Sequence, residues 1–222
     1  MEKAIVLVSG GMDSAVTLYM AKQRYECYAL VFSYGQKASR EVSCALRMAR
    51  KAGIECTTLD ISLPWKGSAL LDEGVEVPGY AGKPQGEIPE TYVPARNILF
   101  LSYAVSYAET IGARAVFIGA HQLDFSNYPD CREAFFDSYR DVVSKGTKSG
   151  AEGRPVEIVT PIINMTKKRI VEEGLRLGVP FELTWSCYSG GESPCGSCES
   201  CMFRERAFRE AGVPDPVLGE GA

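Results

Sequence analysis

The sequence predicts an α/β protein: a doubly wound, mostly parallel five-stranded sheet followed by a small C-terminal appendage. Short apolar runs alternate with segments of helical periodicity, which is typical of parallel strands joined by right-handed crossovers. Polar stretches follow several of these runs, where open sheets place their ligands. Four of the eight cysteines then fall between positions 187 and 201, which sets the end of the chain apart.

Length and composition are consistent with one large domain and an appendage. The chain has 222 residues, 45% of them hydrophobic, and we expect an α/β domain over residues 1–180 and a cysteine-bearing segment over residues 181–222. The formal net charge of −4 argues against a broad nucleic-acid-binding surface, which is usually basic. We find neither a signal-peptide pattern nor an apolar run long enough for a membrane span, so we expect a cytoplasmic protein.

The apolar runs predict the strands. Each run is short and is followed by glycine or polar residues, as buried parallel strands often are. The expected strands are Ala4–Val8, Tyr28–Phe32, Thr57–Ile61, Ala115–Ile118 and Glu157–Val159. Residues 62–93 contain too many glycines and prolines for a long element, and loops of this length are usually functional or mobile.

Helical periodicity and end signals predict the helices. Gly53 and Gly178 are expected to end two of them, and Thr166 to cap the start of one. The helix over residues 95–111 is apolar on most sides, so we expect it to be heavily buried. The expected helices are Ser14–Gln23, Ala38–Ala52, Ala95–Ile111, a segment around residues 135–143, Lys167–Leu177 and Glu199–Ala211.

The first strand leads through two glycines into the first helix, an arrangement that can bind phosphate. Gly10 and Gly11 let the backbone approach an anion, and the loop N–H groups lie at the positive end of the helix dipole. Ser9 and Ser14 can donate hydroxyls, whereas Asp13 beside phosphates would hold Mg²⁺. The alternative is a glycine-rich turn that only joins a strand to a helix.

This loop lacks the lysine of a Walker A motif. It resembles the S-G-G-x-D-S loop of the pyrophosphatase-loop ATPases, which cleave ATP between the α- and β-phosphates. The resemblance implies an adenine nucleotide α-hydrolase-like fold and a set of ATP-binding residues. These are Val8, Ser9, Gly10, Gly11, Met12, Asp13 and Ser14.

The cysteine spacing C-x7-C-x2-C-x2-C is a strong metal-binding pattern. Four thiolates with two C-x-x-C steps can surround one tetrahedral zinc ion, and four sulfurs leave no open position, so the zinc would be structural. The appendage is therefore expected to bind zinc. An iron–sulfur cluster, which uses the same ligand type, and uncoordinated thiols remain alternatives. The expected ligands are Cys187, Cys195, Cys198 and Cys201.

Polar residues suited to a substrate fall in three stretches, 33–36, 92–97 and 124–132, that should face the phosphate loop. Arg96 offers a fork-shaped donor for a carboxylate or phosphate. Lys167, at a helix start near the same edge of the sheet, could neutralise a leaving pyrophosphate.

The same stretches contain groups that fit a planar, guanine-like ring. Asp124 and Asp130 are acceptors suited to its N–H edge, and tyrosines can stack on its face. For each residue the alternative is a surface ion pair or a packing contact. The candidate substrate-binding residues are Tyr34, Gln36, Tyr92, Arg96, Asn97, Asp124, Tyr128 and Asp130.

Over nearly its whole length the chain resembles the 7-cyano-7-deazaguanine synthase family. The matching stretches are SGGMDS at 9–14, FSYGQ at 32–36, TYVPARN at 91–97, DFSNYPDCR at 124–132 and LTWSCYSGGESPCGSCESC at 183–201. The only histidine, His121, stands where an asparagine is common in that family. It is either a general base or a polar residue at a loop start.

The resemblance implies an ATP-dependent ligase of queuosine biosynthesis, acting as a homodimer with structural Zn²⁺ and Mg²⁺. It would convert 7-carboxy-7-deazaguanine and ammonia to 7-cyano-7-deazaguanine through an adenylate and an amide. Asp13, Arg96 and Lys167 would carry the chemistry. Its partners would be small molecules, with no nucleic acid and no membrane.

Two other functions share some of these sequence features. A tRNA sulfurtransferase could share the fold, but it needs a catalytic thiol, for which Cys131 is the candidate, and a basic RNA surface that the charge of −4 does not suggest. A non-enzymatic zinc-ribbon binding module would leave the phosphate loop unexplained.

Overall fold

The computed structural model describes residues 1–38, 40–65, 67–72, 74–80, 87–122, 127–189 and 191–218. Its five strands form one sheet in the order β3–β2–β1–β4–β5, and every neighbouring pair is parallel. The predicted doubly wound sheet is therefore confirmed. The strands are β1 (Lys3–Leu7), β2 (Glu26–Ser33), β3 (Glu55–Asp60), β4 (Ala115–Phe117) and β5 (Glu157–Val159).

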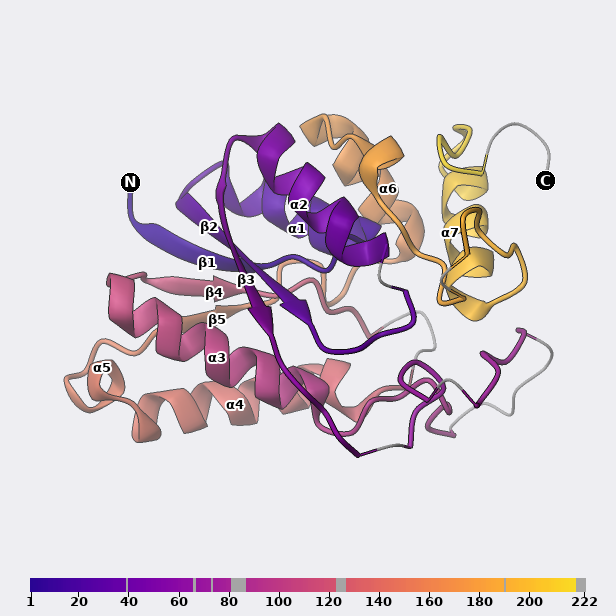
Figure 1. Cartoon of the computed structure of the whole chain (residues 1–222). Helices are drawn as coiled ribbons and strands as arrows, with labels where there is room; N and C mark the ends of the chain where they lie inside the picture. The colour runs from indigo at the N-terminus through magenta and orange to yellow at the C-terminus, as the bar shows by residue number, and fades with distance from the viewer. Residues whose placement is uncertain are drawn as a thin grey trace.

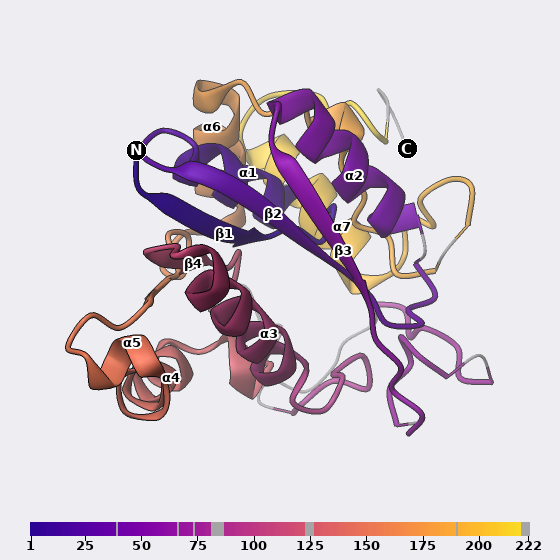
Figure 2. The ribbon, with the colours of Figure 1, turned by 60° about the vertical axis from the view of Figure 1, so that its left-hand side comes forward.

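Helices cover both faces of the sheet (Figure 1). One face carries α1 (Met12–Ala21), α2 (Arg40–Ala52) and α6 (Lys167–Leu177). The other carries α3 (Arg96–Ile111) and α4 (Glu133–Gly146), followed by the one-turn helix α5 (Lys148–Ala151). Figure 2 shows the same two layers from another side.

Strand β1 shows why the apolar runs are continuous. Ala4 and Val6 join the buried cluster beneath α1 and α6, whereas Ile5 and Leu7 join the cluster beneath α3 and α4. Successive side chains of a strand point to opposite faces, and both faces are covered here, so every position is apolar.

The last helix, α7 (Glu199–Glu210), packs beside α6 and lies beyond the carboxyl ends of the strands (Figure 1). Its Phe208 belongs to the same buried cluster as α1 and α6. Arg204 of α7 lies 2.6 Å from the Asp215 carboxylate and donates to the Thr184 hydroxyl at 2.7 Å, all three being buried. A buried ion pair is stable only when its groups are fully hydrogen-bonded, so this network ties the end of the chain to α7.

The predicted helix and strand positions agree with the structure except near their ends and at the shortest elements. Helix α1 begins at Met12 instead of Ser14, because Gly11 already has the extended conformation of an N-cap. The sequence reasoning did not find α5 or the 3₁₀ turns Pro129–Cys131 and Phe181–Leu183, which are too short to show a period.

The expected heavy burial of helix α3 is only half right. Its Leu101 and Ala104 are completely buried, but Ile98 and Tyr103 are 42% and 45% exposed. The helix covers one face of the sheet, so only one side of it is buried against the core. Within the described ranges, no helix is both long and apolar enough to cross a bilayer.

Candidate active site

The loop between β1 and α1 is closed by hydrogen bonds between its own residues. The Ser14 hydroxyl donates to the Gly11 carbonyl at 3.0 Å and accepts from the Ser9 backbone N–H at 3.1 Å. Gly10 has φ of +90°, and a Cβ there would lie 2.1 Å from the Glu41 carbonyl oxygen. Only glycine fits this position, which leaves the loop backbone open at the start of a helix, where anions bind.

Two side chains from distant parts of the chain meet at the Asp13 carboxylate. The Lys167 amine donates to Oδ2 of Asp13 at 2.6 Å, and Nε2 of His121 lies 3.6 Å from the same oxygen. Burial raises the pKa of Asp13, but the charges of Lys167 and His121 outweigh burial and hold the pKa below its ordinary value. The carboxylate is therefore ionised at neutral pH.

The second oxygen of this carboxylate fits a cation ligand. Oδ1 of Asp13 is buried and has no hydrogen-bond partner among the described residues. A buried carboxylate oxygen without a partner is costly, and a hard cation such as Mg²⁺ is the partner that such an oxygen prefers.

The end of β4 packs directly against this loop. A Cβ on Gly119 would lie 3.0 Å from the backbone carbon and oxygen of Asp13 and from the Ser14 nitrogen. Glycine at this position therefore allows the close approach that brings His121 to Asp13.

A cavity of about 250 Å³ opens at the carboxyl edge of the sheet, across β2, β1 and β4. The chain order reverses between β1 and β4, and open sheets bind ligands at such a switch point. One end of the cavity is the loop with Asp13, His121 and Lys167. The middle is apolar and is lined by Leu7, Val8, Leu30, Phe32 and Ile118.

Another part of the cavity lining holds a partly buried cation, Arg96, among aromatic rings. The Arg96 guanidinium donates to the Tyr34 hydroxyl at 3.2 Å, and Tyr128 and Cys131 also line this end. Burial disfavours the Arg96 charge, but interactions with Tyr34, Tyr128 and Cys131 outweigh burial and raise the pKa of Arg96. The side chain is thus a permanent positive charge in the cavity wall, suited to an anionic group.

The candidate substrate residues differ in where they lie. Those that line the cavity are Tyr34, Gln36, Arg96, Asn97 and Tyr128. Asp130 is 5% exposed and does not line it: its carboxylate accepts from the Asn97 backbone N–H at 3.1 Å. Tyr92 accepts from the Ala95 backbone N–H at 3.0 Å and is also outside the lining. Asp124 lies outside the described residues.

Sequence reasoning missed Glu41, which lines the cavity from the first turn of α2. Burial is the main cause that raises its pKa to about 8, against the lowering effect of Arg96. The group is mostly protonated at neutral pH and so does not repel an anion in the cavity. Glu41 lies in the first turn of the helix that follows β2, at the edge of the sheet where ligands bind, and this position could have identified it as a candidate.

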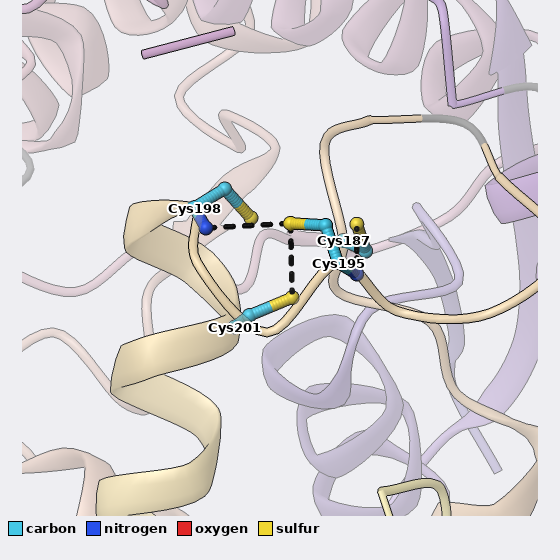
Figure 3. A group of neighbouring side chains, drawn as sticks. All are labelled: Cys187, Cys195, Cys198 and Cys201. Atoms are coloured by element: carbon cyan, nitrogen blue, oxygen red, sulfur yellow. Dashed lines mark hydrogen bonds between the residues drawn. The ribbon is translucent and has the colours of Figure 1, made fainter. Parts of the chain in front are cut away.

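The four clustered cysteines point toward one another (Figure 3). All four sulfurs lie within 4.8 Å of one another, and those of Cys195 and Cys201 are 4.0 Å apart. Four sulfurs at about 2.3 Å from a central zinc ion would be about 3.8 Å apart, so the cluster is close to a tetrahedral site. Hydrogen bonds from the Cys198 and Cys201 thiols lower the pKa of Cys187, and the same contacts raise the pKa of Cys198 and of Cys201. The metal-free cluster thus favours a thiolate at Cys187, the form of a cysteine that a metal binds.

A parallel sheet with a glycine loop and a cavity at the switch point is typical of nucleotide-binding α/β enzymes. The fold is similar to that of the NMN synthetase structure from Francisella tularensis, with a TM-score of 0.51, 17% identity, and coverage of 96% of this chain and 78% of that one.

The chain belongs to the queuosine biosynthesis protein QueC family, whose model matches residues 3–212. It is 47% identical to the 7-cyano-7-deazaguanine synthase of Nostoc sp., over 97% of this chain and 96% of that protein. It is 49% identical to the 7-cyano-7-deazaguanine synthase of Legionella pneumophila subsp. pneumophila, over 98% of this chain and 96% of that protein. The predicted family and the prediction of an enzyme are confirmed.

Proposed function

We propose that this chain is an ATP-dependent carbon–nitrogen ligase that converts 7-carboxy-7-deazaguanine and ammonia to 7-cyano-7-deazaguanine in queuosine biosynthesis. One observation supports the proposal: a single cavity is lined both by the loop with the Asp13–Lys167 pair and by the partly buried Arg96 among tyrosines. We propose that ATP binds at the loop and that a planar carboxylate binds beside Arg96.

The first half of the proposed reaction makes an amide. A carboxylate oxygen attacks the α-phosphorus of ATP and pyrophosphate leaves, which gives an acyl adenylate. Ammonia then attacks the acyl carbon, loses a proton and displaces AMP. Arg96 holds and orients the carboxylate, and Lys167 neutralises charge on the leaving pyrophosphate. Oδ1 of Asp13 would hold Mg²⁺, which would neutralise the phosphates.

The second half removes the amide oxygen. That oxygen attacks the α-phosphorus of a second ATP, pyrophosphate leaves, and the loss of AMP and two N–H protons leaves the nitrile. Two ATP are consumed for each nitrile, and no nucleophilic side chain is required.

The ring of the substrate is proposed to lie among Tyr34, Tyr128 and Asn97. Asp124 stays the proposed acceptor for its N–H edge. The Asp130 carboxylate already accepts from the first turn of α3, so we propose that Asp130 and Tyr92 hold the Arg96 segment in place instead of touching the ring.

The four-cysteine cluster would hold one structural Zn²⁺, which the close spacing of its sulfurs supports. We propose an ATP-binding domain over residues 1–180, a zinc-binding segment over residues 181–222, and a cytoplasmic homodimer.

The alternative sulfurtransferase is less well supported. It needs a reactive thiolate, but burial is the largest cause that raises the pKa of the Cys131 thiol to about 12. The four cysteines of the C-terminal segment form the cluster that is proposed to bind metal, so they are not candidates for the catalytic thiol.

The test is a reaction with the carboxylate, ammonium, ATP and Mg²⁺, followed by mass spectrometry and nucleotide chromatography. We expect the nitrile together with two AMP and two pyrophosphate for each molecule formed. ADP as the only nucleotide product would overturn the adenylate mechanism. Absence of the nitrile would overturn the proposed function.

A further inference from the structure

The cysteine cluster and the phosphate loop are joined by one residue, Trp185. Its backbone N–H donates to the Gly10 carbonyl at 2.8 Å, inside the loop that is proposed to bind ATP. Its indole N–H donates to the carbonyl of Cys187 at 3.0 Å. Trp185 therefore has one hydrogen bond to each site.

The side chain of Trp185 is fixed by its surroundings. It is 3% exposed and packs in one apolar cluster with Cys44, Cys187, Cys198 and Cys201. The Arg40 guanidinium lies 4.5 Å from the centre of its ring, within the range of a cation–π contact. Because the ring has little freedom, a shift of the cysteine segment is passed on to the backbone of Trp185.

The same backbone borders the space for the nucleotide. The Trp185 carbonyl oxygen lies 3.5 Å from where a Cβ of Gly11 would be, and Trp185 lines the cavity. Its neighbours Ser186 and Tyr188, on either side of Cys187, line the cavity as well. Part of the cavity wall is thus built from residues next to Cys187, a proposed metal ligand.

We propose that Trp185 is a positioning residue that couples the metal state of the four-cysteine cluster to nucleotide binding at the phosphate loop. With metal bound, Cys187 is fixed, and Trp185 holds the Gly10 carbonyl so that the loop N–H groups face the phosphates. The inference rests on the proposed nucleotide site, and it assigns to the metal a role in binding beyond that of stabilising the fold. Coupling of this kind is reciprocal: bound ATP must strengthen metal retention by the factor by which metal strengthens ATP binding.

The two tryptophans of the chain allow a clean test, because Trp65 is 52% exposed and Trp185 is buried. The metal-loaded Trp65→Phe protein serves as the reference, with Trp185 as its only indole. The comparison protein carries Trp65→Phe and Trp185→Phe. Titration calorimetry gives the ATP affinity of each protein, and competition with a colorimetric chelator gives the metal affinity with and without saturating ATP.

We expect ATP to raise the metal affinity of the reference protein about tenfold and to have no such effect in the double variant, which should bind ATP about tenfold more weakly at full metal content. An equal increase in both proteins would overturn the coupling, since it would reflect only general stabilisation of the fold. Absence of ATP binding to the loaded reference protein would instead refute the proposed function, and the coupling with it.

A second measurement requires no change at Trp185. Saturating ATP should shift the fluorescence emission of the Trp65→Phe protein, because the loop and the indole move together. An unchanged emission spectrum with ATP bound would contradict the proposal even if the double variant does not fold.

Discussion

The amine of Lys167 lies 2.6 Å from Oδ2 of Asp13, although the two residues are 154 positions apart in the chain. Strand β1 delivers Asp13 to the start of α1, and Lys167 is the first residue of α6. Helices α1 and α6 pack on the same face of the sheet, so their N-termini meet at its carboxyl edge. This pair brings a fixed positive charge to the place where pyrophosphate would leave.

Replacing this lysine should reduce catalysis without unfolding the protein. We expect Lys167→Met to lower kcat/KM by about 10²-fold or more, because a preorganised charge in a partly buried site is lost. Steady-state kinetics and circular dichroism measure the two effects. Lys168→Met is the matched control, since the Lys168 side chain is 46% exposed and faces Glu172. Equal losses in both variants would contradict the assigned role.

The close contact between β4 and the loop predicts a strict requirement at Gly119. Gly119→Ala places a methyl group 3.0 Å from the Asp13 backbone, so the loop must shift. We expect ATP affinity to fall about tenfold, measured by calorimetry. Gly146→Ala should leave the affinity unchanged, because no described atom lies within 4 Å of a Cβ there. Normal ATP affinity in Gly119→Ala would show that the loop tolerates displacement.

Metal analysis should find about one zinc ion per chain. Cys198→Ala should lose the metal and lower the unfolding temperature by roughly 5–10 °C, which corresponds to about 2–3 kcal/mol in a domain of this size. Cys56→Ala, on β3 and away from the cluster, should keep the metal. Iron and sulfide in the purified protein would support the iron–sulfur alternative. A folded, metal-free and fully active Cys198→Ala protein would contradict the metal assignment.

The strands, the glycine loop between β1 and α1, and the clustering of the four cysteines could be predicted because their signals are local. The run Ala4–Val8 and the spacing of the cysteines carry the information in neighbouring residues. The partners of Asp130 and Tyr92 could not be predicted in this way. Their acceptor groups meet backbone N–H groups of the Arg96 segment, and that pairing depends on how two loops pack.

Trp185 and Glu41 were missed for a related reason. Neither residue type suggests a role by itself, and each acts through a contact with a segment distant in sequence. The stretch 183–201 contains Trp185, but its cysteine spacing indicates only a metal site and gives no sign of a contact with another loop. The structure adds that the same stretch is hydrogen-bonded to the phosphate loop at Gly10.

The partly buried Glu41 predicts a stability that depends on pH. Its pKa is raised from 4.5 to about 8, so between these pH values the folded state holds a proton that the unfolded state releases. The free energy of unfolding should therefore fall as pH rises from about 5 to 8 and level off above that. Glu41→Gln should flatten this part of the profile. Urea unfolding at pH 5.5, 7 and 8.5 measures it, and an equal slope in both proteins would contradict the assignment.

The most direct test of the proposed function is to supply the 7-amide of the substrate with ATP and Mg²⁺ and without ammonia. If the chain activates a carboxylate and then the resulting amide at Arg96, the amide should yield the nitrile with one AMP and one pyrophosphate for each molecule. Mass spectrometry and nucleotide chromatography measure both products. An amide that stays unreacted at high concentration, with enzyme that turns over the carboxylate, would contradict the two-step mechanism through a free or rebinding amide.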